Sequence, residues 1–140
     1  MFSITYSESE TEMFGENLAS KLNAGDCLAL RGPLGSGKTA LTRGICRGLQ
    51  CTIDVSSPTF NIVNIYPGAI DVVHVDLYRI SNDIDSIGWD DLFTPEKIII
   101  VEWAEKAKNY LPERHIDVFF SIVDLNTREI KIEFINDSGN

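Results

Sequence analysis

The spacing of apolar residues along the chain predicts a series of helices. Phe14, Leu18 and Leu22 recur every four residues, so they fall on one face of a helix that ends near Gly25. Ser7 and Ser9 precede this stripe and offer N-caps, with glutamates in the first turn. Further helices are expected over three later segments: residues 38–49, 84–93 and 104–111.

Strands are expected between these helices. Residues 26–31 and 97–103 are expected to be strands, and the apolar centre of 97–103 does not alternate with polar residues, which is typical of a strand covered on both faces. A short strand is expected over residues 2–6, and two hairpins over residues 61–66 with 70–78 and residues 115–123 with 128–134. Helices between strands, together with hairpins, predict an α/β fold with a mixed parallel and antiparallel sheet flanked by helices.

Composition fits one globular domain. The chain has 140 residues, of which 44% are hydrophobic and 24% charged, as in ordinary globular proteins. We expect residues 1–135 to form a single domain and residues 136–140 to be a frayed tail. The longest purely apolar run, residues 98–101, is far too short to span a membrane, and no signal peptide is recognised, so a cytoplasmic location is expected. The three cysteines show no CxxC spacing and are expected to be reduced, with Cys27 in the core.

The net charge of −9 disfavours direct binding to a phosphate backbone. If the protein serves RNA chemistry, we expect it to act through protein partners. The alternative is that the charge only keeps the domain soluble.

A phosphate-binding loop is the strongest chemical signal. Residues 32–39, GPLGSGKT, match G-x-x-x-x-G-K-[ST] in full, between a predicted strand and a predicted helix. Glycines let backbone amides approach phosphate oxygens, Lys38 supplies a charge for the β- and γ-phosphates, and Thr39 offers a hydroxyl to Mg²⁺. The sequence therefore predicts ATP or ADP with Mg²⁺, held by Leu34, Gly35, Ser36, Gly37, Lys38 and Thr39.

Two carboxylates follow apolar strands and could serve the metal. These are Asp76 in VVHVD and Glu102 in IIIVE. We favour Glu102 as the metal-side acid because its strand is the more apolar, which leaves Asp76 nearer the γ-phosphate or its attacking water. Each taken alone could equally be a surface acid at a strand end.

Other polar positions are less decisive. The segment Ser57-Pro58-Thr59-Phe60 could sense the γ-phosphate, which makes Thr59 a candidate catalytic residue, or it could be a proline-stiffened connector. His74 alternates with valines and is interpreted as packed or surface, and Trp103 as a core residue. Three arginines could contact phosphate or base, and the pattern does not choose among Arg31, Arg79 and Arg128.

Together these landmarks resemble the TsaE family, the small P-loop ATPases of bacterial tRNA threonylcarbamoyladenosine biosynthesis. The matching stretches run in family order and cover nearly the whole chain: GDCLALRGPLGSGKTALTRGICRGL, SPTFNIVNIY, VHVDLYRI, IGWDDLF, IIIVEWAEK and TREIKI. Pro33 and Ser36 depart from the usual family loop, and we expect binding to survive both.

The resemblance implies a P-loop NTPase fold and a set of roles. It implies Mg²⁺ bound by Thr39 and Glu102, a role for Asp76 in hydrolysis, and a switch-like SPTF loop. It implies that Arg128 packs on the adenine and that Glu8 lies near the base. It also implies that the protein works with TsaD and TsaB, and that its ATP hydrolysis supports their turnover.

Three other functions share the loop. A small-molecule kinase commonly has an arginine-rich lid, and no arginine-dense segment follows the strand carboxylates. A GTPase would read guanine with N-K-x-D, which is absent from the sequence. A nucleotide-dependent binding module without useful hydrolysis stays open, because Asp76 and Glu102 could serve binding alone.

Overall fold

A computed structural model describes residues 1–52, 55, 61–80 and 83–136. Its elements in chain order are β1 (Phe2–Thr5), α1 (Glu8–Ala19), β2 (Cys27–Arg31), α2 (Lys38–Gly48), β3 (Val63–Tyr66), β4 (Val72–Asp76), the 3₁₀-helix η1 (Ile84–Ile87), α3 (Trp89–Leu92), β5 (Ile98–Glu102), the 3₁₀-helix η2 (Ala104–Ala107), β6 (His115–Ile122) and β7 (Arg128–Ile135).

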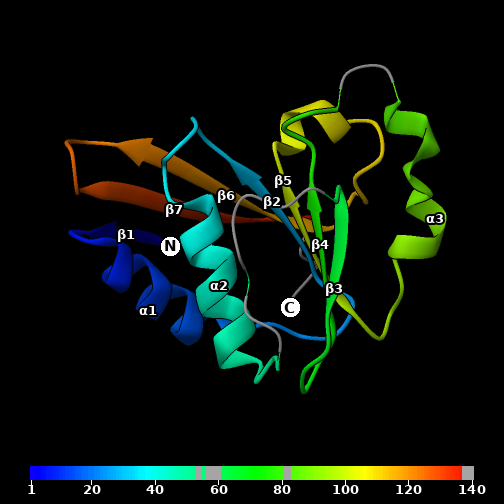
Figure 1. The fold of residues 1–140 in the computed structure, drawn as a ribbon, viewed down its shortest axis with the longest axis horizontal. Helices are drawn as coiled ribbons and strands as arrows, with labels where there is room; N and C mark the ends of the chain where they lie inside the picture. The colour runs from blue at the N-terminus through cyan, green and yellow to red at the C-terminus, as the bar shows by residue number, and fades with distance from the viewer. Residues whose placement is uncertain (53–54, 56–60, 81–82, 137–140) are drawn as a thin grey trace.

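One twisted sheet of seven strands runs through the molecule in the order β1-β7-β6-β2-β5-β4-β3 (Figure 1). Strands β6, β2, β5 and β4 are parallel, whereas β3, β7 and β1 join antiparallel at the two edges. Both predicted hairpins are present as β3–β4 and β6–β7, so the predicted mixed sheet is confirmed.

Helices cover both faces of the sheet. Helices α1 and α2 lie on one face, where Leu41 and Ile45 of α2 pack with Leu28 and Leu30 of β2 in one apolar cluster. The other face carries a second cluster in which Trp89 of α3 packs against sheet residues such as Val101. Figure 1 shows α2 and α3 on opposite sides of β4. Strand β2 lies between β6 and β5 and is covered on both faces of the sheet, so its buried residues are apolar on both faces.

Helix α1 begins as the capping pattern predicts. The Ser7 hydroxyl accepts a hydrogen bond from the Glu10 amide at 3.1 Å, and Glu10 Oε1 accepts one from the Tyr6 amide at 3.0 Å. The helix packs closely on α2: a Cβ added at Gly44 of α2 would lie only 2.0 Å from the carbonyl oxygen of Glu12 in α1. Only a residue without a side chain allows this approach of the two helix backbones.

Two predicted helices were wrong in length. The segment 84–93 is broken by Gly88, whose φ of 83° separates η1 from α3. The segment 104–111 contains only η2, in which Ala104 and Ala107 are both buried. Their three-residue spacing suits the 3.0 residues per turn of a 3₁₀-helix better than an α-helix.

Among the described residues, no helix is both long and apolar enough to cross a bilayer. Cys27 is buried as predicted, and burial together with the nearby Asp117 and Asp26 raises the pKa of its thiol to about 12. Of the predicted tail, Asn136 donates a side-chain hydrogen bond to the Glu113 carbonyl, and residues 137–140 lie outside the described part.

Candidate functional site

The phosphate-binding loop lies between the end of β2 and the start of α2. Gly35 and Gly37 adopt φ values of 77° and 110°, in the left-handed region that residues with side chains rarely enter. A Cβ at Gly32 would lie 2.9 Å from both Phe120 and the Ser36 hydroxyl. The glycines of the motif are therefore required by backbone conformation and by close packing.

Backbone donors of this loop point to an anion site. The amides of Gly35, Gly37, Lys38 and Thr39 find no hydrogen-bond acceptor among the described residues, whereas the Ser36 amide binds the Pro33 carbonyl at 3.2 Å. The first regular helical bond of α2 is from the Leu41 amide to the Gly37 carbonyl. Free amides at a helix N-terminus bind phosphate and other anions.

Lys38 lies at the centre of the site and is 4% exposed. Its ammonium donates to the carbonyls of Gly32 and Pro33, the latter at 3.0 Å, and it lies 4.0 Å from the centre of the Trp103 ring. Burial lowers the pKa of Lys38 below its ordinary value, although Glu102, Glu105 and Asp76 act in the opposite direction. The ammonium is thus held by its own loop in a place where phosphate oxygens could replace the carbonyls.

The two predicted carboxylates are brought together. Asp76 and Glu102 are paired in the register of the parallel strands β4 and β5, and both come at the carboxyl ends of these strands. Glu102 is buried, and its Oε2 lies 2.5 Å from His74 Nε2. Asp76 is half-buried, and its Oδ1 accepts a hydrogen bond from the Tyr78 amide at 3.0 Å.

The donor set fits a magnesium ion. Thr39 supplies a hydroxyl, Asp76 and Glu102 supply carboxylates, and all three line one cavity. Mg²⁺ prefers oxygen ligands and is commonly held by one or two carboxylates together with substrate phosphates. No group of three or more acidic, histidine or cysteine side chains that could hold a metal alone is found in the part of the chain described.

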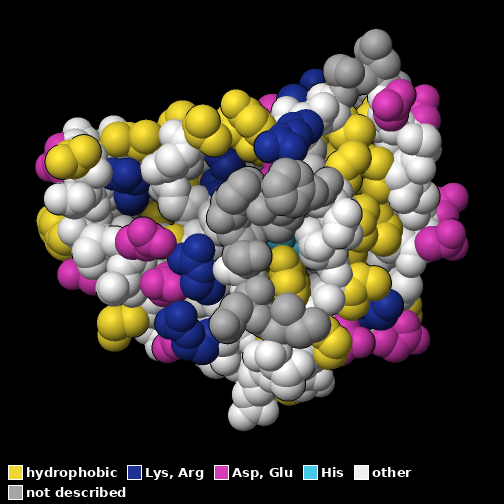
Figure 2. Space-filling view, in the orientation of Figure 1, with side chains coloured by type: hydrophobic (Ala, Val, Ile, Leu, Met, Phe, Trp, Pro, Cys, Tyr) yellow, Lys and Arg dark blue, Asp and Glu magenta, His cyan; other side chains and the backbone are white. Residues whose placement is uncertain are grey.

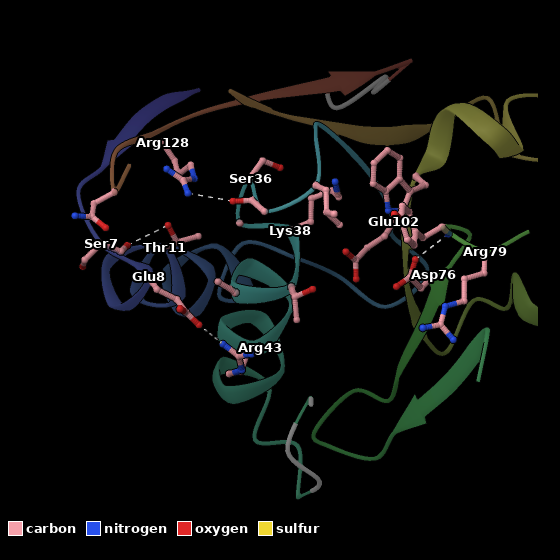
Figure 3. A pocket seen from close by; sticks show the side chains of 18 of the residues that line it. Ser7, Glu8, Thr11, Ser36, Lys38, Arg43, Asp76, Arg79, Glu102 and Arg128 are labelled. Atoms are coloured by element: carbon pink, nitrogen blue, oxygen red, sulfur yellow. Dashed lines mark hydrogen bonds and ion pairs between the residues drawn. The ribbon is translucent and has the colours of Figure 1, made fainter. Parts of the chain in front are cut away.

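The cavity has a volume of about 600 Å³ and joins segments that are distant in the sequence (Figure 3). It extends from the start of α1, across the loop and α2, to the ends of β4 and β5 and the tip of the β6–β7 hairpin. Its lining residues are Ser7, Glu8, Thr11, Leu34, Gly35, Ser36, Gly37, Lys38, Thr39, Ala40, Arg43, Asn61, Ile62, Asp76, Tyr78, Arg79, Glu102, Trp103, Leu125, Asn126 and Arg128.

Basic side chains concentrate at this cavity although the chain is acidic overall. Lys38, Arg43, Arg79 and Arg128 all line it. Figure 2 shows Lys and Arg side chains around the middle of this face and most Asp and Glu side chains nearer its margins. The lining also contains Glu8, Asp76 and Glu102, so its formal charge is slightly positive although that of the whole chain is −9, which is compatible with an anionic ligand bound together with a cation.

Arg128 and Glu8, the two residues assigned to the base, lie on the side of the loop away from the carboxylates (Figure 3). The Arg128 guanidinium donates to the Gly35 carbonyl at 3.1 Å and to the Asp124 carbonyl at 2.9 Å, so it ties the β6–β7 hairpin to the phosphate-binding loop. Glu8 pairs with Arg43 at 3.0 Å.

The structure also adds residues that the sequence pattern did not single out. Arg43 lies on α2 four residues after Thr39, so helical spacing could have placed it on the same side. Tyr78 packs on Trp103 with ring centres 5.2 Å apart and ring planes tilted by 36°. Trp103 lines the cavity as well as packing against the core. Thr59 lies outside the described residues.

Comparison with known proteins gives a consistent answer. The family model described as "Threonylcarbamoyl adenosine biosynthesis protein TsaE" matches residues 5–130. The TsaE protein of Bacillus subtilis is 34% identical over 127 residues, covering 90% of this chain and 80% of the relative. The TsaE protein of Streptomyces coelicolor is 43% identical over 104 residues, covering 71% and 70% of the two chains.

Among solved structures, the crystal structure of YdiB from Bacillus subtilis superposes with a TM-score of 0.86 at 29% sequence identity, covering 98% of this chain and 86% of that one. This agrees with a P-loop NTPase type of α/β fold. The match of the family model over residues 5–130, with full-length relatives of the same name, shows that the chain belongs to the TsaE family of tRNA threonylcarbamoyladenosine biosynthesis.

Proposed function

We propose that this protein binds ATP and ADP with Mg²⁺ and hydrolyses ATP in support of tRNA threonylcarbamoyladenosine formation, acting with TsaB and TsaD. The family membership supports the pathway, and the cavity supports the nucleotide. The location that goes with this role is the cytoplasm.

One observation carries the proposal. Four unpartnered amides and the buried Lys38 ammonium face the same cavity as Thr39, Asp76 and Glu102. Phosphoryl transfer depends mostly on positioning and charge compensation, and this arrangement provides both on one rigid loop and two adjacent strands. The hydroxyl and the carboxylates would hold a metal ion, which would compensate the charge of the phosphates.

Each residue then has a defined task. The amides of Gly35, Gly37, Lys38 and Thr39 bind phosphate oxygens, and Lys38 exchanges its loop carbonyls for the β- and γ-phosphates. Thr39 and Glu102 would hold Mg²⁺, which when bound neutralises charge on the phosphate oxygens. Asp76 would orient the attacking water and accept its proton. Arg128 and Glu8 would contact the adenine side of the nucleotide.

The test has two parts. Calorimetry with ADP should show binding that tightens when Mg²⁺ is added, and ATP hydrolysis should be stimulated by TsaB and TsaD together. Co-purification of the three proteins in ATP, ADP or no nucleotide should depend on the nucleotide. Binding of ATP with transfer of its phosphate to a small acceptor, and no nucleotide-dependent association with the two partners, would instead favour a kinase.

A further inference from the structure

A histidine lies behind one of the two carboxylates of the cavity. His74 on β4 and Glu102 on β5 have side chains that are 3% and 4% exposed, and their Nε2 and Oε2 atoms are 2.5 Å apart. His74 precedes Asp76 by two residues on one strand, so both side chains belong to the same face of the sheet. Of this pair only Glu102 lines the cavity.

The surroundings of this pair are apolar. His74 is opposite Ile100 in the strand register, and its ring centre lies 6.1 Å from that of Tyr66. Ile100 and Tyr66 belong to the main core cluster. A carboxylate buried in such a place is costly unless it is hydrogen-bonded, and within the described residues His74 is its one side-chain partner.

The geometry of the hydrogen bond fixes the carboxylate. A carboxylate that binds a metal must be ionised and can then only accept hydrogen bonds, so in that state Nε2 carries the hydrogen and donates the hydrogen bond to Oε2. His74 Nδ1 is buried and has no partner in the described part of the chain, so no second hydrogen bond competes for the ring. Oε2 of Glu102 is thereby hydrogen-bonded to His74, and Oε1 is left for a ligand in the cavity.

We propose that His74 is a positioning residue that orients Glu102 for Mg²⁺ bound with the nucleotide. This inference rests on the proposed function, since it needs Glu102 as the metal-side acid. Groups that hydrogen-bond to a metal ligand fix its orientation, and removing them commonly weakens metal binding by about 10- to 100-fold. His74 would therefore contribute to magnesium affinity without touching either metal or nucleotide.

A magnesium titration of ADP binding tests this inference. We would compare wild type with His74→Leu, which lacks the donor, and His74→Gln, whose amide nitrogen can donate from a similar reach. Val72→Ala is the matched control, because Val72 is fully buried on the same strand and face but is opposite Ile98 in the strand register, four residues before Glu102. Glu102→Gln reports whether Glu102 itself serves the metal.

The Mg²⁺ concentration that gives half of the maximal increase in ADP affinity should be about tenfold higher in His74→Leu than in wild type. In His74→Gln it should return towards the wild-type value. ADP affinity without Mg²⁺ should stay within about twofold, and Val72→Ala should lower the melting temperature without changing the titration. A wild-type titration in His74→Leu, with a shifted one in Glu102→Gln, would overturn the inference alone. Wild-type titrations in both would overturn the metal assignment of Glu102 as well.

Nuclear magnetic resonance gives a second test, which uses only the wild-type protein and therefore does not depend on whether a variant folds. The His74 Nε2 proton should give an exchange-protected resonance because both side chains are buried. That resonance should shift when Mg²⁺ is added to the ADP complex, and by less when ADP is added alone. A resonance that does not respond to Mg²⁺ would assign His74 a purely structural role.

Discussion

Lys38 donates hydrogen bonds to the carbonyls of Gly32 and Pro33, and phosphate oxygens would replace these carbonyls when a nucleotide binds. We expect Lys38→Ala to weaken ADP binding at least tenfold in calorimetry, because a charge-assisted partner of the phosphates is lost. Lys131→Ala is the control, since it removes one exposed lysine charge that is not part of the cavity lining. Unchanged binding in Lys38→Ala would argue against the loop as the nucleotide site.

The same residue predicts a pH dependence. Burial lowers the pKa of Lys38 in the free protein, and the phosphates bind only its charged form. ADP affinity should therefore be complete below that lowered pKa and fall as the pH rises through it, at a pH below that of an ordinary lysine. Calorimetry from about pH 7 to about pH 10 should show the decline, which Lys38→Arg should abolish. A constant affinity across this range would contradict the prediction.

Asp76 and Glu102 should separate in function although they are neighbours in the strand register. Glu102→Ala should weaken the magnesium dependence of nucleotide binding. Asp76→Ala should leave binding nearly intact and lower partner-stimulated turnover by about 10²-fold, as for a lost general base. The reverse result, with magnesium dependence lost in Asp76→Ala, would exchange the two roles.

For individual residues of the site, the sequence predicted those that follow one another along the chain. The phosphate-binding loop is read directly from residues 32–39, because its donors follow one another along the chain. The contact between His74 and Glu102 joins residues 28 apart on different strands, so no local pattern contains it. His74 was interpreted as packed or surface, and the structure shows that it is buried. Its partner could not be identified until the strand order was known.

Among the elements, helices α1 and α2 pack with their backbones close together at Gly44. A Cβ at Gly44 would lie 2.0 Å from the Glu12 carbonyl, so Gly44→Ala must push the helices apart. We expect a loss of about 1–3 kcal/mol in the free energy of unfolding by urea denaturation. Ser9→Ala, at an exposed position of α1, should change it by less than about 0.5 kcal/mol. A Gly44→Ala variant as stable as wild type would show that α1 and α2 can move apart without a loss of free energy of unfolding.

The β6–β7 hairpin should affect the base side of the nucleotide through Arg128, which binds the Gly35 carbonyl at 3.1 Å. We expect Arg128→Ala to weaken the binding of ADP several-fold more than the binding of pyrophosphate. The contact with adenine is lost, whereas the amides of the phosphate-binding loop remain. Equal losses for both ligands in calorimetry would show that Arg128 acts only by holding the loop.

The elements that were predicted well have a strong local signal. Both hairpins and the central strands follow from turn residues and uninterrupted apolar runs. The two short helical segments were predicted too long, because their ends depend on a left-handed Gly88 and on Ala104 and Ala107 packing against the sheet. Periodicity alone does not distinguish a single 3₁₀ turn from the start of an α-helix.

For the molecule as a whole, we expect slow ATP hydrolysis without partners. The sequence pattern did not choose among Arg31, Arg79 and Arg128 as phosphate contacts, and the structure places Arg43, Arg79 and Arg128 at the cavity. Arg43 is paired with Glu8 and Glu12, and Arg128 is bound to backbone carbonyls, so these two are already engaged. Steady-state assays should give well under one turnover per second for the isolated chain, in the range of unassisted P-loop hydrolysis. Many turnovers per second without TsaB and TsaD would refute this.

The walls of the cavity come from positions as far apart as Ser7 and Arg128. A ligand seated there would bridge the beginning, middle and end of the folded chain at once. Its binding free energy would then oppose global unfolding and not only the opening of one loop. Thermal melting should for this reason be a sensitive assay of occupancy, and amides as distant as those of β1 and β7 should exchange with solvent more slowly once the site is filled.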